Sequence, residues 1–356
     1  MTEKLSTISR PPELSVPALL ERSRELCMPS LREAVGQLAS PMDAVAAYHF
    51  GWTDRQGKPS AGDGGKMLRP ALALISAQAA GAPAGGVRGG VAVELVHNFS
   101  LLHDDFMDGD ETRRYRATAW TVFSPTLAIL TGDALLALAS DVLLSNRSDG
   151  VSPSDRARAV QRLTTASRRL IDGQARDLSF EHHSQISVQQ CLEMEADKTA
   201  ALLACACAIG AVLAGADDVT ADALGRFGHH MGLAFQAVDD LLGIWGAPES
   251  TGKPHWGDLR RRKKSLPVCA ALADGGKASR QLAGLIAAPG GHGDQDDQQL
   301  AKRAFLIEAA GGRTWTQHEA RRQHEEALAA LNEVSMPEGV RESFTALAEF
   351  VIKRTR

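Results

Sequence analysis

The sequence predicts an all-α fold for this chain of 356 residues. Long segments carry apolar residues at three- and four-residue spacing, which places those residues on one face of a helix. Few stretches show the two-residue alternation that is typical of half-buried strands. The chain is also rich in Ala and Leu, which favour helices, and aromatic residues make up only 5% of it.

Apolar periodicity defines the helices in order, and clusters of Gly, Pro and Ser define the loops between them. The predicted helices span residues 16–39, 69–80, 86–108, 120–145, 155–182, 186–214, 219–245, 264–273, 299–311, 315–333 and 338–354. The predicted loops span residues 53–64, 146–154, 248–256 and 273–297.

Nothing in the sequence marks a domain boundary, so we expect a single helical domain over residues 16–356. Residues 1–15 are polar and contain prolines, and we expect them to be disordered. Residues 288–299 are rich in Gly, Asp and Gln, and we expect a flexible insertion there.

Composition excludes several classes of protein. The formal charge of −4 argues against a nucleic-acid binder, which usually has a basic surplus. The five cysteines have no metal-ligand spacing and fit the reduced thiols of a cytoplasmic protein. No signal peptide or membrane anchor is expected. The uncharged run 199–216 is Ala-rich and closely bounded by charges, so we interpret it as a buried core helix.

An acidic cluster follows a long apolar helical segment. Asp104 and Asp108 are four residues apart, one turn above each other on one face, and Asp105 is adjacent. Carboxylates stacked in this way repel each other unless a cation lies between them, and Mg²⁺ prefers such oxygens. Arg113 and Arg114 follow, and guanidinium groups suit phosphate oxygens. The alternative is a solvated helix end, which the apolar residues before the cluster disfavour.

A second apolar helix ends in another acidic pair, Asp239 and Asp240, which Gln236 precedes. A Gly-containing loop with Lys253 follows, and then a basic run that ends near Lys263. We interpret this as a second metal site facing the first, with lysines that close over a polyphosphate. The alternative is a helix cap followed by a solvated basic run, but the likeness of the two clusters favours the metal site.

Weaker signals accompany the two clusters. Gly64 and Gly65 precede Lys66 and Arg69 at the start of a helix, where backbone amides and positive charges can bind an anion. His97 lies two turns before the first cluster on the same helical face. It can donate to a phosphate, or it is a core histidine whose hydrogen bonds are satisfied within the protein.

Polar residues also interrupt two later apolar helices. Gln174 and Asp177 lie one turn apart, and Lys198 with Thr199 begins the Ala-rich helix. These side chains either face the same cavity as the acidic clusters or form hydrogen bonds between helices.

The motifs that carry these residues occur together in one order: GGKMLRP, LLHDDFMDGDETRR, GQARDL, DKTA and FQAVDD with TGK downstream. In this the chain resembles the trans-isoprenyl diphosphate synthases, the polyprenyl synthetase family, and above all the actinobacterial geranylgeranyl diphosphate synthases. The resemblance covers roughly residues 20–355. It implies antiparallel helices around a central apolar cavity, usually in a homodimer.

The resemblance also implies roles for individual residues, with Mg²⁺ as the cofactor. The implied ligands of Mg²⁺ are Asp104, Asp105, Asp108, Asp239 and Asp240. The implied contacts of the allylic diphosphate are Arg113, Lys198 and Lys253, with Lys263 able to reach the site. The implied contacts of isopentenyl diphosphate are Lys66, Arg69, His97 and Arg114, and Gln236 and Thr199 line the reacting region.

Two departures from the family pattern concern the second cluster. Gly243 stands where a third aspartate is usual, which affects the outermost ligand of that site. Trp256 and Gly257 replace a more common Gly-Ser before Asp258, so we expect altered packing of this loop.

The helix before Asp104 would form a wall of the cavity, and Phe99 lies five residues back, about 7.5 Å along the helix. Ser100 is small. In the family, an aromatic residue at the deeper of these two positions, here Phe99, and none at the other resembles the pattern of geranylgeranyl diphosphate synthases. We therefore expect Phe99 to be the floor, the alternative being an ordinary core residue on a neighbouring face.

The sequence thus predicts a prenyltransferase that condenses isopentenyl diphosphate with an allylic diphosphate, most simply to geranylgeranyl diphosphate. A farnesyl diphosphate synthase is one alternative. A class I terpene cyclase is another, although Lys66, Arg69 and Arg114 would give it a diphosphate site that it does not use. A non-catalytic partner subunit is disfavoured because the acidic residues are intact.

Overall fold

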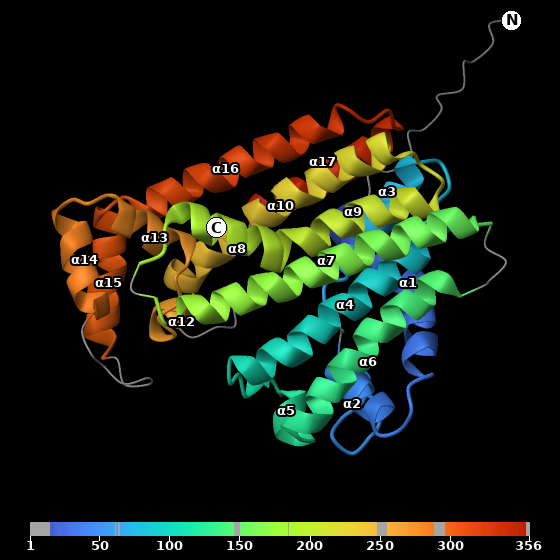
Figure 1. Ribbon diagram of the computed structural model, residues 1–356, viewed down its shortest axis with the longest axis horizontal. Coiled ribbons are helices and arrows are strands. Elements are labelled where there is room, and N and C mark those ends of the chain that lie inside the picture. The colour runs from blue at the N-terminus through green and yellow to red at the C-terminus, as the bar shows by residue number, and fades with distance from the viewer. Residues whose placement is uncertain are drawn as a thin grey trace, which may run out of the picture.

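The computed structural model describes residues 15–60, 62, 65–145, 150–183, 185–247, 255–287 and 296–353. The predicted all-α fold is confirmed (Figure 1). The longer helices are α1 (Val16–Val35), α3 (Leu68–Ala79), α4 (Gly85–Met107), α6 (Pro125–Leu144), α7 (Pro153–Phe180), α9 (Ala201–Leu213), α10 (Asp218–Trp245), α14 (Lys277–Ala287), α15 (Asp297–Ala309), α16 (Gly312–Leu331) and α17 (Glu338–Lys353). The shorter helices are α2 (Met42–His49), α5 (Ala119–Val122), α8 (Val188–Glu195), α12 (Gly257–Arg260) and α13 (Leu266–Ala273).

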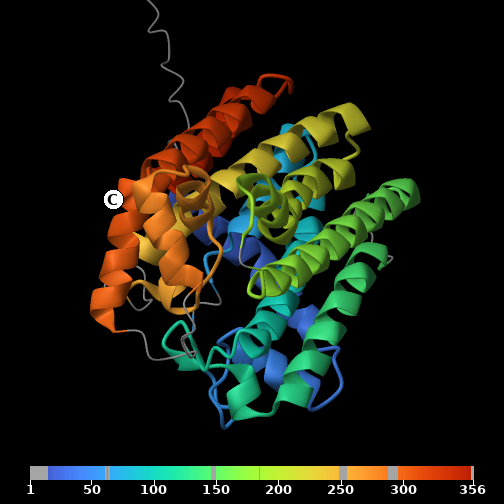
Figure 2. The same ribbon diagram turned by 60° about the vertical axis from the view of Figure 1, so that its left-hand side comes forward.

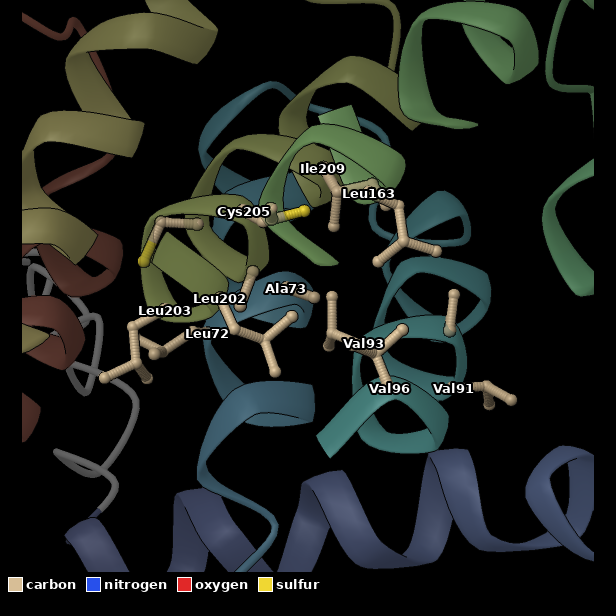
Figure 3. Packing of buried hydrophobic residues seen from close by; sticks show 14 of the residues in the cluster. Leu72, Ala73, Val91, Val93, Val96, Leu163, Leu202, Leu203, Cys205 and Ile209 are labelled. Atoms are coloured by element: carbon tan, nitrogen blue, oxygen red, sulfur yellow. The ribbon is translucent and has the colours of Figure 1, made fainter. Parts of the chain in front are cut away.

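The core lies where α3, α4, α7 and α9 meet, and it is built from small and branched apolar side chains (Figure 3). The Ala-rich helix α9 lies among its neighbours and is almost wholly buried. Its Gly210 has no room for a side chain, because a Cβ there would lie 1.9 Å from the carbonyl oxygen of Ala73 on α3. Small residues on α9 therefore set how closely these helices approach one another.

Side-chain caps explain several helix starts. Ser124 accepts a hydrogen bond from the backbone of Leu127, and Ser152 does the same for Asp155. Ser187 and Gln190 form a complete capping box at the start of α8. Each cap satisfies a backbone N–H that the first turn would otherwise leave unpaired.

The structure corrects the sequence prediction in five places. The helix predicted over residues 120–145 is broken before Pro125, where Ser124 begins a new helix. The loop predicted over residues 273–297 contains α14, whose apolar face packs on α15. The prediction also missed α2, α12 and a hairpin of two-residue strands, β1 (Thr112–Arg113) with β2 (Arg116–Ala117).

The helix predicted over residues 186–214 is continuous but not uniform. Between α8 and α9 the residues Ala196–Ala200 form a π-helical turn, which we call the π turn. The predicted disordered segment 1–15 lies outside the described residues apart from its last residue. The predicted insertion 288–299 lies outside them up to residue 295, and its last residues begin α15.

Two helical segments of the described chain are long and apolar enough to cross a membrane, judged by length and composition alone. The first is Val188–Leu213, which spans α8 to α9 and is 72% buried in the apolar window, as a core helix is. The second is α6, which is only 39% buried and lies with α7 at one edge of the bundle (Figure 2).

The close approach of α9 to α3 gives a stability prediction. Gly210→Ala should destabilise the fold by about 1–3 kcal/mol or more, since the new Cβ collides with backbone rather than with a flexible side chain. Gly225→Ala on α10 is the matched control, because its Cβ would meet Ala208 at an ordinary 3.7 Å. That change should be neutral or should stabilise by up to about 1 kcal/mol. Urea denaturation of both variants measures the difference, and equal effects would contradict this packing.

Candidate active site

The first acidic cluster lies at the C-terminal end of α4, with Asp108 as the capping residue. The negative end of the helix dipole lies here, and the last turn contains no basic residue. Burial raises the pKa of Asp104 to about 6 although the charge of Lys198 opposes the rise, and the pKa of Asp108 is raised as well, by its partial removal from water. A bound cation would therefore stabilise the ionised form of these two carboxylates, which burial disfavours.

Asp105 has a different environment from its neighbours. Its side chain is 2% exposed, and one oxygen accepts a hydrogen bond from Arg113 Nε at 2.6 Å. Its other oxygen is buried with no hydrogen-bond partner. The structure thus separates Asp105 from Asp104 and Asp108 and ties it to the hairpin that follows the helix.

The second acidic cluster repeats this division. Asp240 is fully buried and accepts hydrogen bonds from Gln236 Nε2 at 3.0 Å and from Lys263 Nζ at 3.2 Å. The backbone N–H of Leu266 donates to its second oxygen at 2.8 Å. Burial alone would raise the pKa of Asp240, but the charge of Lys263, a hydrogen bond with Glu195 and the other donors outweigh burial and lower this pKa. Asp239 is half-buried beside it and contributes to the negative potential at Lys263.

Asp258 fills the space that the missing third aspartate of this cluster would need. A Cβ on Gly243 would lie 2.1 Å from an Asp258 carboxylate oxygen. Asp258 is 5% exposed and lies on α12. A carboxylate is therefore present at this position of the cluster, but it reaches there from a later element of the chain.

Ion pairs and charges of shared neighbours link the two clusters. Asp177 on α7 pairs with Lys198 at 2.5 Å and acts electrostatically on both Asp108 and Lys263. Arg261, which follows α12, contacts Asp110 after α4 at 3.2 Å. Burial alone would lower the pKa of Lys263, but Asp240 and the other surrounding carboxylates raise it well above its usual range, so the amine stays charged.

A second group of basic residues lies beside the first cluster. A side chain on Gly65 would collide with the Arg114 guanidinium at 2.6 Å, so Arg114 lies against the loop that carries Lys66. Burial, with the charges of Arg69 and Arg114, holds the pKa of His97 well below its usual range, and its ring is neutral. Arg69 is half-buried, and Glu94 on α4 provides its opposing charge. The residues predicted to bind the second diphosphate therefore lie together.

Backbone strain is concentrated around these groups. Within the described residues, the non-glycine residues with positive φ are Met67, Arg114, Tyr115, Trp256 and Arg262. Each lies next to or within a predicted site segment. Such conformations cost about 1–2 kcal/mol per residue and persist only where the surrounding structure holds them.

The remaining predicted residues are placed as follows. Lys198 and Thr199 lie in the π turn, and Thr199 donates to Gln236 at 2.8 Å. Lys253 lies outside the described residues. Gln174 is 7% exposed, and both polar atoms of its side chain lack a hydrogen-bond partner.

The sequence analysis assigned no role in the site to Asp177, Glu94 or Asp258. The position of Asp177 one turn after Gln174 was a signal for it. Glu94 could have been found as a lone acid inside an apolar helix, because such a group needs a buried partner. Asp258 had no local signal, because its neighbour Gly243 lies on another helix.

The arrangement fits Mg²⁺ with water and substrate as further ligands. No three His, Cys, Asp or Glu side chains of the described residues converge on one point as a complete metal site. Asp104 and Asp108 instead provide two carboxylates at a helix end whose own last turn carries no basic residue. Mg²⁺ is commonly held in this way, by one or two carboxylates together with substrate phosphates.

The fold and the site define a class of helical enzymes in which paired carboxylates at helix ends lie beside a basic cluster. Comparison with known proteins agrees. The family model described as polyprenyl synthetase matches residues 52–304. The chain belongs to the polyprenyl synthetase family, as predicted, and is a chain-elongating trans-prenyltransferase.

Two relatives from Mycobacterium tuberculosis carry different product names. The chain is 45% identical over 337 residues to a (2E,6E)-farnesyl diphosphate synthase, which covers 94% of this chain and 92% of that protein. It is 44% identical over 339 residues to a geranylgeranyl diphosphate synthase, with 95% and 93% covered. These relatives support the two product lengths equally.

Solved structures agree in fold. A polyprenyl synthetase from Streptomyces coelicolor is 61% identical, with a TM-score of 0.89 and 95% of this chain and 99% of that chain covered. A geranylgeranyl pyrophosphate synthase from Corynebacterium glutamicum, complexed with isoprenyl diphosphate and magnesium, is 28% identical, with a TM-score of 0.81 and 96% and 100% covered. The family uses a divalent metal.

The raised carboxylate pKa values give a pH prediction. Burial raises the pKa of Asp104 and of Asp105 from 3.8 to about 6, so the folded chain binds more protons than the unfolded chain between these values. Their contribution to stability is present below pH 3.8 and is lost as the pH rises through about 6. Mg²⁺ binds the ionised form and should reverse this loss only at the higher pH.

Thermal unfolding with and without Mg²⁺ measures this effect. At about ten times its Kd the ion should add about 1.4 kcal/mol at pH 8 and little at pH 5. The double variant Asp104→Asn, Asp108→Asn should lose most of the increase at pH 8 and show little at pH 5. An equal increase in Tm at both pH values would contradict the assignment of these carboxylates.

Proposed function

We propose that this enzyme condenses isopentenyl diphosphate with farnesyl diphosphate to give geranylgeranyl diphosphate. The observation that carries the proposal is the coexistence of two separate anion sites: the carboxylate clusters with Lys198 and Lys263, and the basic group around Arg69 and Arg114. An enzyme that joins two diphosphate substrates needs both sites. A class I cyclase, which ionises a single substrate, needs only the first.

The residues divide the work of ionising the allylic substrate. Mg²⁺ ions, held by Asp104 and Asp108 at the first cluster and by Asp239 at the second, would neutralise the leaving diphosphate and favour cleavage of its C–O bond. Arg113, Lys198 and Lys253 would contact the same diphosphate, and Lys263 supplies a further charge. Asp105 and Asp240 hold Arg113 and Lys263 in place for this task. Preorganised charges of this kind require no rearrangement as negative charge develops.

The second substrate is held by Lys66, Arg69, His97 and Arg114. A neutral His97 can donate to a phosphate oxygen without adding charge. Gln236 and Thr199 line the reacting region between the two sites. The double bond of isopentenyl diphosphate attacks the allylic cation, and the released diphosphate takes the proton that is then lost, which fits the family pattern.

The floor of the product cavity is the basis for choosing twenty carbons. Phe99 is 4% exposed, and its ring packs edge-on against His103 with centroids 4.7 Å apart. His103 in turn lies over Gly132 of α6, where a Cβ would come within 2.4 Å of the imidazole. Phe99 is thus supported from behind and resists displacement by a growing chain. The small Ser100 beside it donates a hydrogen bond to the His97 carbonyl.

We also propose that a second copy of the chain covers α6, giving a homodimer that works in the cytoplasm. Leu130 and Leu144 on α6 are about half exposed, and a groove of about 440 Å³ runs between α6 and α7. The aspartates Asp133 and Asp141 within α6 disfavour insertion into a membrane. Sedimentation should give twice the mass of the chain.

The condensation itself is tested with purified protein, Mg²⁺, isopentenyl diphosphate and farnesyl diphosphate, with mass spectrometry of the products. We expect a twenty-carbon diphosphate, and Asp104→Ala should reduce its formation about 100-fold or more, as loss of a group that stabilises developing charge does. Asp222→Ala is the control, since this exposed aspartate pairs with Arg162 at a distant surface. A cyclic product formed without isopentenyl diphosphate would indicate a cyclase, and no reaction with any allylic primer would favour a partner subunit.

The floor is tested by Phe99→Ala, which should yield products longer than those of the parent enzyme. The change costs about 3–5 kcal/mol of stability, so Phe99→Leu provides a milder version with the same direction. Phe227→Ala is the matched control, because this buried ring packs on Phe344 at 5.0 Å in another part of the core. Unchanged product length in both Phe99 variants would place the floor at another residue.

A further inference from the structure

The π turn Ala196–Ala200 is an irregularity at the centre of the site. Its sequence, ADKTA, contains two alanines and no proline or glycine, and it favours an ordinary α-helix. A π turn is rare and less favourable, and it often marks a functional position. Since the local sequence does not impose this conformation, contacts from other elements have to maintain it.

Gly173 on α7 is the first such contact. A Cβ at this position would lie 2.2 Å from the backbone nitrogen of Lys198 and 2.6 Å from its Cα. The backbone of α7 therefore reaches the backbone of the π turn at Lys198 itself. Only glycine permits this approach, so the position of Lys198 depends on α7.

Asp197 is bound by two arginines of α7, one on each side of Gly173 in the sequence. Its carboxylate accepts a hydrogen bond from Arg169 Nε at 2.7 Å on one oxygen and from Arg176 at 2.8 Å on the other. Arg169 lies one turn before Gly173, and Arg176 lies one turn after it. The carboxylate is 16% exposed and is held by two charge-assisted bonds, which fix its plane as a single bond would not.

Three successive residues of the π turn are thus each tied to a neighbouring helix. Asp197 is held by the two arginines of α7, Lys198 by Asp177 of α7, and Thr199 by Gln236 of α10. Among these three residues, only Asp197 is bound by side chains that take no part in the proposed chemistry. Its partners Arg169 and Arg176 are 39% and 49% exposed and lie outside both acidic clusters.

We propose that Asp197 is a positioning residue, which with Arg169 and Arg176 holds the π turn so that Lys198 and Thr199 face the allylic substrate. The inference rests on the proposed function, because it assigns those two residues to the allylic diphosphate site. Asp197 itself does not touch substrate. Its effect is on one of the two substrates, since the isopentenyl site around Arg69 has no residue in the π turn.

The test is Asp197→Asn, which keeps the shape of the side chain and removes the charge that binds two arginines. KM for the allylic diphosphate should rise about tenfold, a part of the 100-fold that a misplacement of about 1 Å can cost. KM for isopentenyl diphosphate should stay within about twofold of the parent value, because its site is separate. Arg176→Gln removes one of the two arms and should give a smaller increase in the same KM.

Asp218→Asn is the matched control. Asp218 also accepts hydrogen bonds from two arginines of α7, Arg158 at 2.8 Å and Arg162 at 3.0 Å, but it lies at the start of α10, 69% exposed. This control should leave both KM values unchanged. If Asp197→Asn lowers Tm and impairs both substrates equally, or changes neither KM, the positioning role is wrong. Failure of the parent enzyme to condense the two diphosphates would instead contradict the proposed function.

Discussion

Two ion pairs with buried carboxylates, Asp105 with Arg113 and Asp240 with Lys263, fix one cation beside each acidic cluster. Each pair joins the end of a long helix to a basic residue in the segment that follows it. Removing the basic partner leaves a buried carboxylate uncompensated, which costs up to about 3–5 kcal/mol in a fully buried pair. The pairs therefore fix where the cations stand before any substrate arrives.

This constraint divides the labour within each acidic motif. The second aspartate of each motif, Asp105 or Asp240, binds a basic side chain of the protein. The first, Asp104 or Asp239, remains available to a metal ion. The strained residues Arg114 and Arg262 lie next to the two cations that are held in this way. The stability supplied by the buried pairs and the surrounding helices maintains a backbone that local preferences alone would not adopt.

Much of the fold could be predicted from the sequence because its signals are local. Apolar periodicity gave the long helices, and the spacing of Asp104 and Asp108 gave a carboxylate pair on one helical face. The different environment of Asp105 depends on which side of α4 faces the hairpin, and the motif alone does not reveal this. Asp258 opposite Gly243 is a contact between distant segments. The π turn, which its own residues do not favour, is contacted by Gly173 and by the arginines that bind Asp197. The missed helix α14 lies between glycine-rich segments that resemble loops, although its own apolar residues pack on α15.

The division between the two aspartates of the first motif is tested most directly by metal binding. Mn²⁺, which resembles Mg²⁺ and is visible by electron paramagnetic resonance, can be titrated into Asp104→Asn and Asp105→Asn in the presence of inorganic diphosphate. The account predicts that Asp104→Asn loses most of the bound ion while Asp105→Asn retains it but binds the diphosphate less well, because Arg113 is no longer held. Loss of Mn²⁺ binding in Asp105→Asn with retention in Asp104→Asn would contradict it.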